Sequence, residues 1–152
     1  MASHREFQVF AMIQRLVELD ADAVDAYAVA VERARDAGWR PSLIHFQDDH
    51  ERHLLELRGF LDARDAEFSP TFGVRRTLKQ GRVVLASVLG DRSLLRVLRS
   101  QEQNLSEDYG LAVSQPSLPP ELAAILNAGF ADEQQHLDWL DRRSAKLGQP
   151  GD

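Results

Sequence analysis

The stretch Phe46-Gln47-Asp48-Asp49-His50-Glu51-Arg52-His53 places two of the chain's five histidines three residues apart. Residues at this spacing share one face of an α-helix. The same face continues along the chain with apolar side chains, namely Leu43, Phe46, Leu54, Leu57 and Leu61. His50 and His53 are therefore predicted to point into a core, where each buried imidazole needs a polar partner.

Composition places the chain among ordinary globular proteins and excludes several classes of site. Its 152 residues suit one domain, spanning 1–152, and its apolar content of 43% is enough for a real core. The net charge of −6 argues against nucleic acid as a partner. The absence of cysteine excludes disulfides, iron–sulfur clusters and thiolate zinc sites.

No targeting or membrane segment is evident in the sequence. None of its apolar runs approaches the roughly 20 residues that span a bilayer. The first residues, Met1-Ala2-Ser3-His4-Arg5, lack the apolar centre of a signal peptide. We therefore expect a cytoplasmic protein without a membrane span.

Apolar periodicity predicts an all-α protein, an antiparallel bundle of four long helices with one extended connection. Glycines and prolines punctuate the pattern: Gly38 is predicted to stop the first helix, and Asp91 to cap the third long helix. The four long helices are predicted at 7–37, 41–63, 92–113 and 120–147. A short amphipathic helix at 74–89 is predicted in the connection between the second and third.

Each inward stripe is interrupted by residues that do not belong in an apolar core. They are Asp20, His50, His53, Glu102, Glu133 and His136. Unpaired, such buried charges would destabilise the fold by several kcal/mol each. Carboxylate and imidazole together suit iron, manganese or zinc, so the six residues are predicted to form a metal site.

The two halves of the sequence also resemble each other. Asp20 is followed seven residues later by Tyr27, and Glu102 is followed seven residues later by Tyr109. A histidine follows the first acid by 30 residues, and an acid follows the second by 31. This pattern indicates a duplicated helical hairpin. Both tyrosines are expected to pack in the core or to donate hydrogen bonds to the carboxylates.

Residues 10–145 resemble the ferritin-like superfamily. The likeness is closest to small bacterial ferritin-like proteins of unknown function, in the stretches 19–24, 49–53 and 102–109. The spacing from acid to tyrosine is also similar to that of the rubrerythrin bundle. Sites in this superfamily use a single Glu from each of two helices and Glu-x-x-His from each of the other two.

The resemblance implies a role for each of the six residues. Asp20 and Glu102 take the single-carboxylate positions, and Glu133 with His136 forms one acid-x-x-His pair. His50 and His53 take the other pair, so His50 stands where a bridging Glu is usual. Asp20 is also one methylene shorter than the usual Glu.

The implied cofactor is iron, as a di-iron centre, with manganese or zinc as alternatives. The implied function is oxidation of Fe(II) or reduction of peroxide in a stress response. A haem site would need an axial methionine on the second helix, but the only methionines are Met1 and Met12. The inserted segment and the lack of a clear fifth helix at the C-terminal end lead us to expect a monomer or homodimer rather than a multi-subunit storage cage.

A second hypothesis stays open from the sequence alone. The buried histidines could pair with the carboxylates in a network that binds no metal, and the protein would then be a non-catalytic helical interaction protein. Asp48, Asp49 and Glu51 are expected to be solvated or to support the ligands rather than to bind metal. Trp39 and Trp139 are expected at helix ends or at an oligomer contact.

Overall fold

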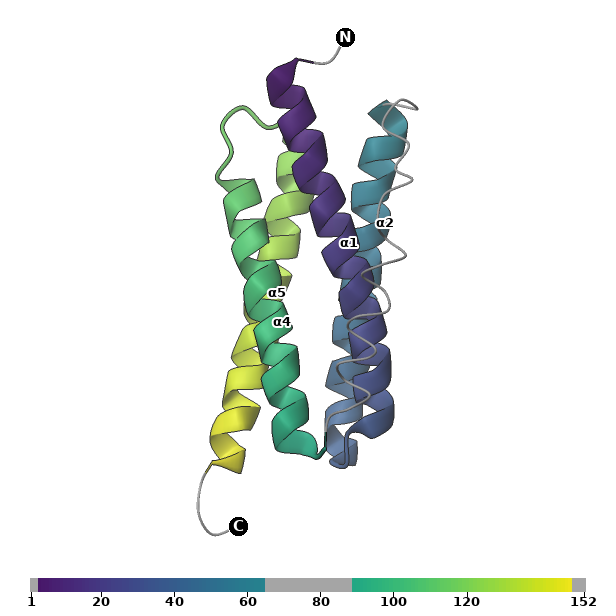
Figure 1. The fold of residues 1–152 in the computed structure, drawn as a ribbon, viewed down its shortest axis with the longest axis vertical. Helices are drawn as coiled ribbons and strands as arrows, with labels where there is room; N and C mark the ends of the chain where they lie inside the picture. Colours follow the sequence, from purple (N-terminus) through teal and green to yellow (C-terminus); the bar gives the residue numbers. More distant parts are fainter. Residues whose placement is uncertain (1–2, 65–88, 149–152) are drawn as a thin grey trace.

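The computed structural model describes residues 3–64 and 89–148, and these are almost entirely helical, with no strand among them (Figure 1). The long helices are α1 (His4–Arg33), α2 (Arg40–Arg64), α4 (Asp91–Val113) and α5 (Pro120–Leu147). A short 3₁₀ helix, Ala37–Trp39, links α1 to α2. The all-α class with four long helices is thus confirmed. The helix predicted at 74–89 lies outside the described residues, apart from Leu89, which is not helical.

The four helices pack side by side as two antiparallel hairpins. α1 pairs with α2 and α4 pairs with α5, while α1 also contacts α4 and α2 contacts α5. The end of α2 and the start of α4 lie at opposite ends of the bundle, so these two helices run in the same direction (Figure 1). None of the helices in the described ranges is long and apolar enough to cross a membrane.

Helix ends follow local polar contacts, and three of the predicted helix ends are wrong. α1 ends at Arg33 rather than at 37, since the chain leaves the helix at Ala34 and Asp36 then caps the 3₁₀ turn. Asp91 lies inside α4 rather than capping it. Its carboxylate accepts hydrogen bonds from the backbone N–H groups of Arg35 and Asp36, at 2.8 and 3.0 Å. Asp91 thereby ties the end of α1 to the start of α4.

The start of α1 also differs from the predicted residue 7. Ser3 and Glu6 form a capping box in which each side chain accepts a hydrogen bond from the other's backbone N–H. This pairing satisfies donors that the first turn leaves free, so the helix begins three residues earlier, at His4.

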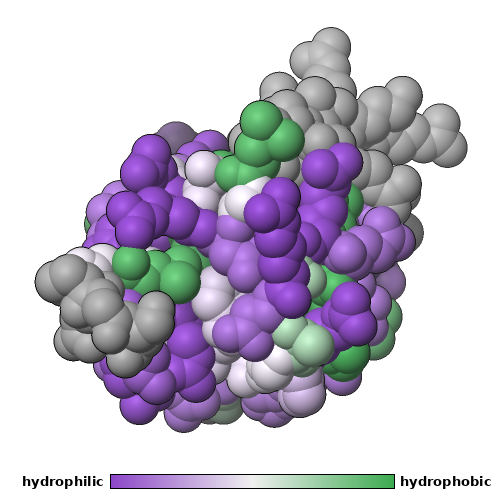
Figure 2. Space-filling model, turned by 90° about the horizontal axis from the view of Figure 1, so that it is seen from below, coloured by the Kyte–Doolittle hydropathy of each residue, from purple (hydrophilic) through white to green (hydrophobic). Residues whose placement is uncertain are grey.

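Two apolar clusters fill the interior, one toward each end of the bundle. One contains the pair Trp39 and Trp139, whose ring centroids lie 6.0 Å apart in an edge-to-face arrangement. The other is built around Ile13, Leu57 and Leu126. The buried polar residues of the interior come from the middle of the four helices. Seen from the lower end of Figure 1, the surface is mostly hydrophilic with separated apolar patches (Figure 2).

Close packing of α4 against α5 depends on a glycine. A Cβ built on Gly129 would lie 2.6 Å from Cε1 of Tyr109, a side chain that is fully buried. Because the Tyr109 ring is enclosed and cannot move away, the Gly129→Ala variant should lose about 1–3 kcal/mol of unfolding free energy. The measurement is urea denaturation followed by circular dichroism.

Gly59 provides the matched control for that substitution. It lies on the exposed face of α2, and a Cβ there would meet nothing within 4 Å. Gly59→Ala should therefore stabilise the protein by about 0.5–1 kcal/mol through helix propensity alone. Equal effects of the two substitutions would show that the contact between Gly129 and Tyr109 is not as tight as described.

Candidate metal centre

The six predicted site residues come together in the middle of the bundle. α1 supplies Asp20 and α4 supplies Glu102, while α2 and α5 each supply a pair; all six side chains are at most 2% exposed. Their ligand atoms form two overlapping groups of four within which all atoms lie within 4.8 Å of one another. One group is Asp20, His50, His53 and Glu133; the other is His50, Glu102, Glu133 and His136.

The imidazoles of His53 and His136 are oriented alike. Each presents Nδ1 to the centre, where His53 lies 3.3 Å from Asp20 Oδ1 and His136 lies 3.2 Å from Glu102 Oε1. Each Nε2 instead pairs with an aspartate, His53 with Asp132 and His136 with Asp49, both at 2.8 Å. An Nε2–H held by a carboxylate leaves Nδ1 free to bind a metal, which is the usual arrangement of ligating histidines.

Asp132 is a residue of this network that the sequence analysis missed, whereas Asp49 was expected either to be solvated or to support the ligands, and its contact with His136 agrees with the second alternative. Asp49 is 4% exposed, and it supports a histidine of the opposite hairpin, as Asp132 does. A signal was available, because an aspartate stands directly before both His50 and Glu133. Arg52 lies on the outer side of the bundle and forms ion pairs with both aspartates, so it links α2 to α5.

The tyrosines hold the single carboxylates, as one of the sequence-based alternatives proposed. Tyr27 donates its hydroxyl hydrogen to Glu102 Oε1 at 2.5 Å, and Tyr109 donates to Asp20 Oδ2 at 2.7 Å. Burial first, and then the charge of the paired carboxylate, raises the pKa of both tyrosines well above 10. They therefore remain hydrogen-bond donors at any physiological pH.

These bonds are exchanged between the two hairpins, which agrees with the internal repeat. The tyrosine of each hairpin binds the carboxylate of the other, and the aspartate of each binds the other's histidine. Each residue involved has its counterpart 82 or 83 positions away in the chain. The centre thus has an approximate two-fold axis that relates α1 to α4 and α2 to α5.

His50 breaks this symmetry, since its counterpart is Glu133. Its Nδ1 lies 3.0 Å from Asp20 Oδ1 and its Nε2 lies 2.9 Å from Glu102 Oε1, so the ring spans the centre. Burial lowers the pKa of His50, but the charge of Glu102 and the hydrogen bonds to both carboxylates outweigh it and raise the pKa to about 10. Without metal, His50 is a buried imidazolium.

Glu133 is the residue that the protein leaves unsatisfied. Neither of its oxygens has a hydrogen-bond partner among the described residues, and the same is true of Glu102 Oε2. The nearest imidazole nitrogens, on His50 and His53, lie 3.5 and 3.4 Å away. Burial, followed by the charge of Glu102, raises the pKa of Glu133 well above its ordinary 4.5. A cation between these groups would supply the missing partner.

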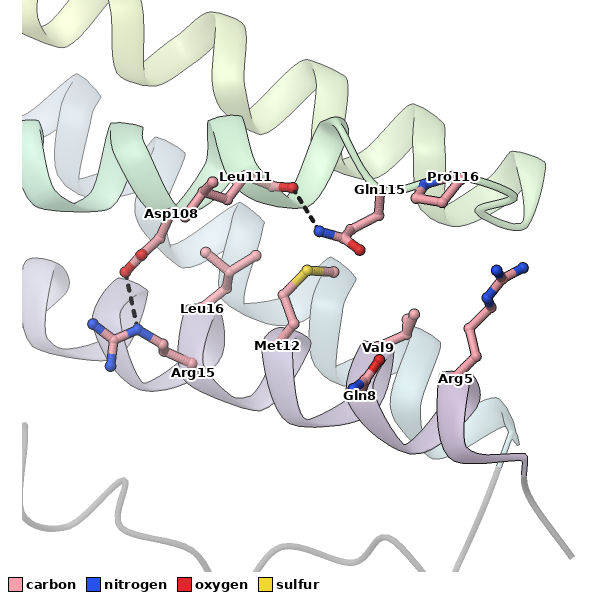
Figure 3. A pocket seen from close by; sticks show the side chains of 10 residues that line it. All are labelled: Arg5, Gln8, Val9, Met12, Arg15, Leu16, Asp108, Leu111, Gln115 and Pro116. Atoms are coloured by element: carbon pink, nitrogen blue, oxygen red, sulfur yellow. Dashed lines mark hydrogen bonds and ion pairs between the residues drawn. The ribbon is translucent and has the colours of Figure 1, made fainter.

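A larger cavity lies away from the centre, between the N-terminal half of α1 and the C-terminal end of α4 (Figure 3). Its volume is about 510 Å³, and Met12 and Leu16 line it together with Arg5 and the ion pair of Arg15 with Asp108. None of the six site residues lines this cavity. Its shape therefore has no direct bearing on the metal centre.

Comparison with known proteins gives no further assignment: no family model, curated protein or solved structure matches the chain. The chemistry of the site thus rests on its own geometry. Buried carboxylates and imidazoles from four helices are placed so that they could hold a metal ion.

The raised pKa of His50 predicts how the metal-free protein responds to pH. A histidine that binds its proton more tightly when folded stabilises the fold fully below its unfolded pKa of 6.5, and this contribution is lost as pH rises toward 10. Glu133, whose pKa is also raised, acts in the same direction above 4.5. The urea midpoint of chelator-treated protein should therefore fall between pH 6.5 and 9.

The His50→Gln variant is the control for this titration. Its urea midpoint should be lower than that of the parent at pH 6.5, and its decline toward pH 9 should be shallower, because the main group that titrates is gone. A parent whose stability is constant or rises over this range would contradict the assignment of a buried imidazolium.

Proposed function

We propose that this chain is a ferritin-like metal-binding protein that holds two divalent transition-metal ions in its core, iron in preference to manganese or zinc. The observation that carries the proposal is Glu133, which contributes to both candidate ligand groups and lacks a hydrogen-bond donor for either oxygen. A fold held only by its own hydrogen bonds would not bury a carboxylate in this way without a compensating partner.

The donor set fits this choice of metal. Asp20 and His53 would serve one ion, Glu102 and His136 would serve the other, and Glu133 would lie between them. Mixed oxygen and imidazole donors suit iron, manganese and zinc, and the absence of thiolates disfavours copper(I). When bound, such ions act as Lewis acids, and iron or manganese also exchanges electrons.

The surrounding residues would hold the side chains that bind the ions in fixed orientations. Asp49 and Asp132 fix the rings of the two outer histidines, while Tyr27 and Tyr109 fix the single carboxylates. By its resemblance to ferritin-like proteins, such a centre is proposed to support ferrous oxidation or peroxide reduction during stress. The almost complete burial of the ligands would keep the reacting groups away from bulk water.

One observation favours the alternative of a metal-free interaction protein. His50, as an imidazolium, already pairs with both Asp20 and Glu102. That network, however, leaves Glu133 without a donor, and an ion-pair network built for stability would pair it as well. The two proposed functions therefore differ most in the partner that each requires for Glu133.

Metal content tests the proposal directly. Protein expressed without a histidine tag and loaded with Fe(II) under anaerobic conditions should hold about two ions per chain, as in di-iron carboxylate bundles. In the double variant His53→Ala/His136→Ala, each ion loses an imidazole, so affinity should fall by more than about 100-fold. Elemental analysis after gel filtration measures the bound metal. The exposed residue His4, changed to Ala, is the matched control and should leave metal content unaltered.

Glu133→Gln should separate metal binding from stability. Replacing this carboxyl group, which has no hydrogen-bond partner among the described residues, with an amide should stabilise the chelator-treated protein by about 1–4 kcal/mol while greatly weakening metal binding. Glu102→Gln should instead destabilise it by about 3–5 kcal/mol, because Glu102 accepts hydrogen bonds from Tyr27 and from His50. Urea denaturation and metal analysis of both variants provide the comparison. Loss of stability in Glu133→Gln, with no metal bound by the parent, would favour the ion-pair network.

A further inference from the structure

A small cavity leads from the surface between α1 and α4 to the metal centre. Its volume is about 110 Å³, enough for a few water molecules. Asn104 is exposed, whereas Tyr27 and Glu102 are each 1% exposed and belong to the centre itself. The cavity thus joins solvent to a carboxylate of both the hydrogen-bond network and the candidate ligand set.

The lining of this cavity is paired across the approximate two-fold axis. Three residues of α1 face their counterparts on α4, which lie 82 positions later in the chain. The pairs are Leu19 with Gln101, Asp22 with Asn104, and Ala23 with Leu105. A cavity with this lining lies close to the axis, and it reaches the group of candidate ligands that contains Glu102.

The chemistry of the lining selects for a cation. Asp22, Gln101 and Asn104 place a carboxylate and two amide groups along the cavity, and Glu102 and Tyr27 follow at its inner end. No lysine, arginine or histidine is among the described residues that line it. Carboxylate and amide oxygens are donors that suit divalent cations, and none of these described lining residues carries a positive charge that would repel a cation. The larger cavity, by contrast, is lined by Arg5 and Arg15.

One carboxylate oxygen of the residues that line this cavity lacks a hydrogen-bond partner. Glu102 Oε2 is buried and has no hydrogen-bond partner among the described residues, and Glu102 lines the cavity. A carboxylate in that state offers a free ligand to an ion arriving from solvent. We propose that the cavity between α1 and α4 is the passage by which divalent metal ions reach the centre, with Asp22 drawing them in and Glu102 receiving them. This inference rests on the proposed metal-binding function.

Uptake kinetics test the passage separately from binding itself. Metal-free full-length protein is mixed rapidly with Co(II), and the visible absorbance of the bound ion gives both the rate and the final stoichiometry. Ala23→Met, which fills the cavity, should slow uptake by about tenfold or more, because ions must then await an opening of the helices. The final stoichiometry should equal that of the parent, since no ligand has changed.

Removal of a negative charge at the cavity provides a second test of the passage. Asp22→Asn should slow uptake by roughly threefold at low salt and weaken its dependence on ionic strength, because the local attraction is reduced. Glu32→Gln removes the same charge from an exposed position of α1 that does not line the cavity, and it should leave the rate unchanged.

The outcomes separate the two proposals. Parental uptake rates in both Ala23→Met and Asp22→Asn would overturn the passage and leave metal binding intact. A parent that takes up no Co(II) would overturn both. If Ala23→Met does not fold, Asn104→Phe covers the cavity from an exposed position, and a parental rate in that variant overturns the passage.

Discussion

The charge balance at Glu133 is the constraint on which the rest of the centre depends. A carboxylate in the middle of four apolar helices must be neutralised by a proton or a cation, because solvent cannot reach it. Asp20 and Glu102 surround it with further negative charge, and the imidazoles of the same layer offset only part of that charge. The apolar clusters on either side separate this layer from the two ends of the bundle, so most of its polar groups must be satisfied from within the protein or by a bound ion.

The internal repeat explains how a small chain forms a hydrogen-bond network that connects all four helices. Each hairpin carries an acid and a tyrosine on its first helix, and an aspartate and a histidine on its second. The bonds from the two tyrosines to carboxylates, and those from Asp49 and Asp132 to histidines, all cross from one hairpin to the other. These bonds therefore form only when the hairpins dock, and they fix the register of that docking. Arg52, whose counterpart is Gln135, adds a contact that only one side possesses.

Much of this arrangement could be read from periodicity, because polar residues that recur on an apolar helical face must meet in the core. That argument located all six residues of the two candidate ligand groups. It did not locate Asp132 and left two alternatives for Asp49, because both residues lie about 100° around their helices from the inward stripe. Whether they face solvent or a histidine depends on the distance and rotation between α2 and α5. The end of α1 was also missed, since it depends on Asp91, which is 55 and 56 residues distant in sequence from the groups that it binds.

His50 is best understood as a response to folding without metal. A glutamate at this position would restore the two-fold symmetry, but it would place a fourth carboxylate beside Asp20, Glu102 and Glu133 in the newly folded chain. The imidazolium instead pairs with both Asp20 and Glu102 from inside the fold, and among the described residues it leaves Glu133 as the carboxyl group with no partner for either oxygen. The protein thereby gains stability without a bound ion, and under the proposed function an incoming ion would have to displace a proton from a group whose pKa is about 10. The residue that stabilises the metal-free bundle would then also set how strongly the bundle competes for metal.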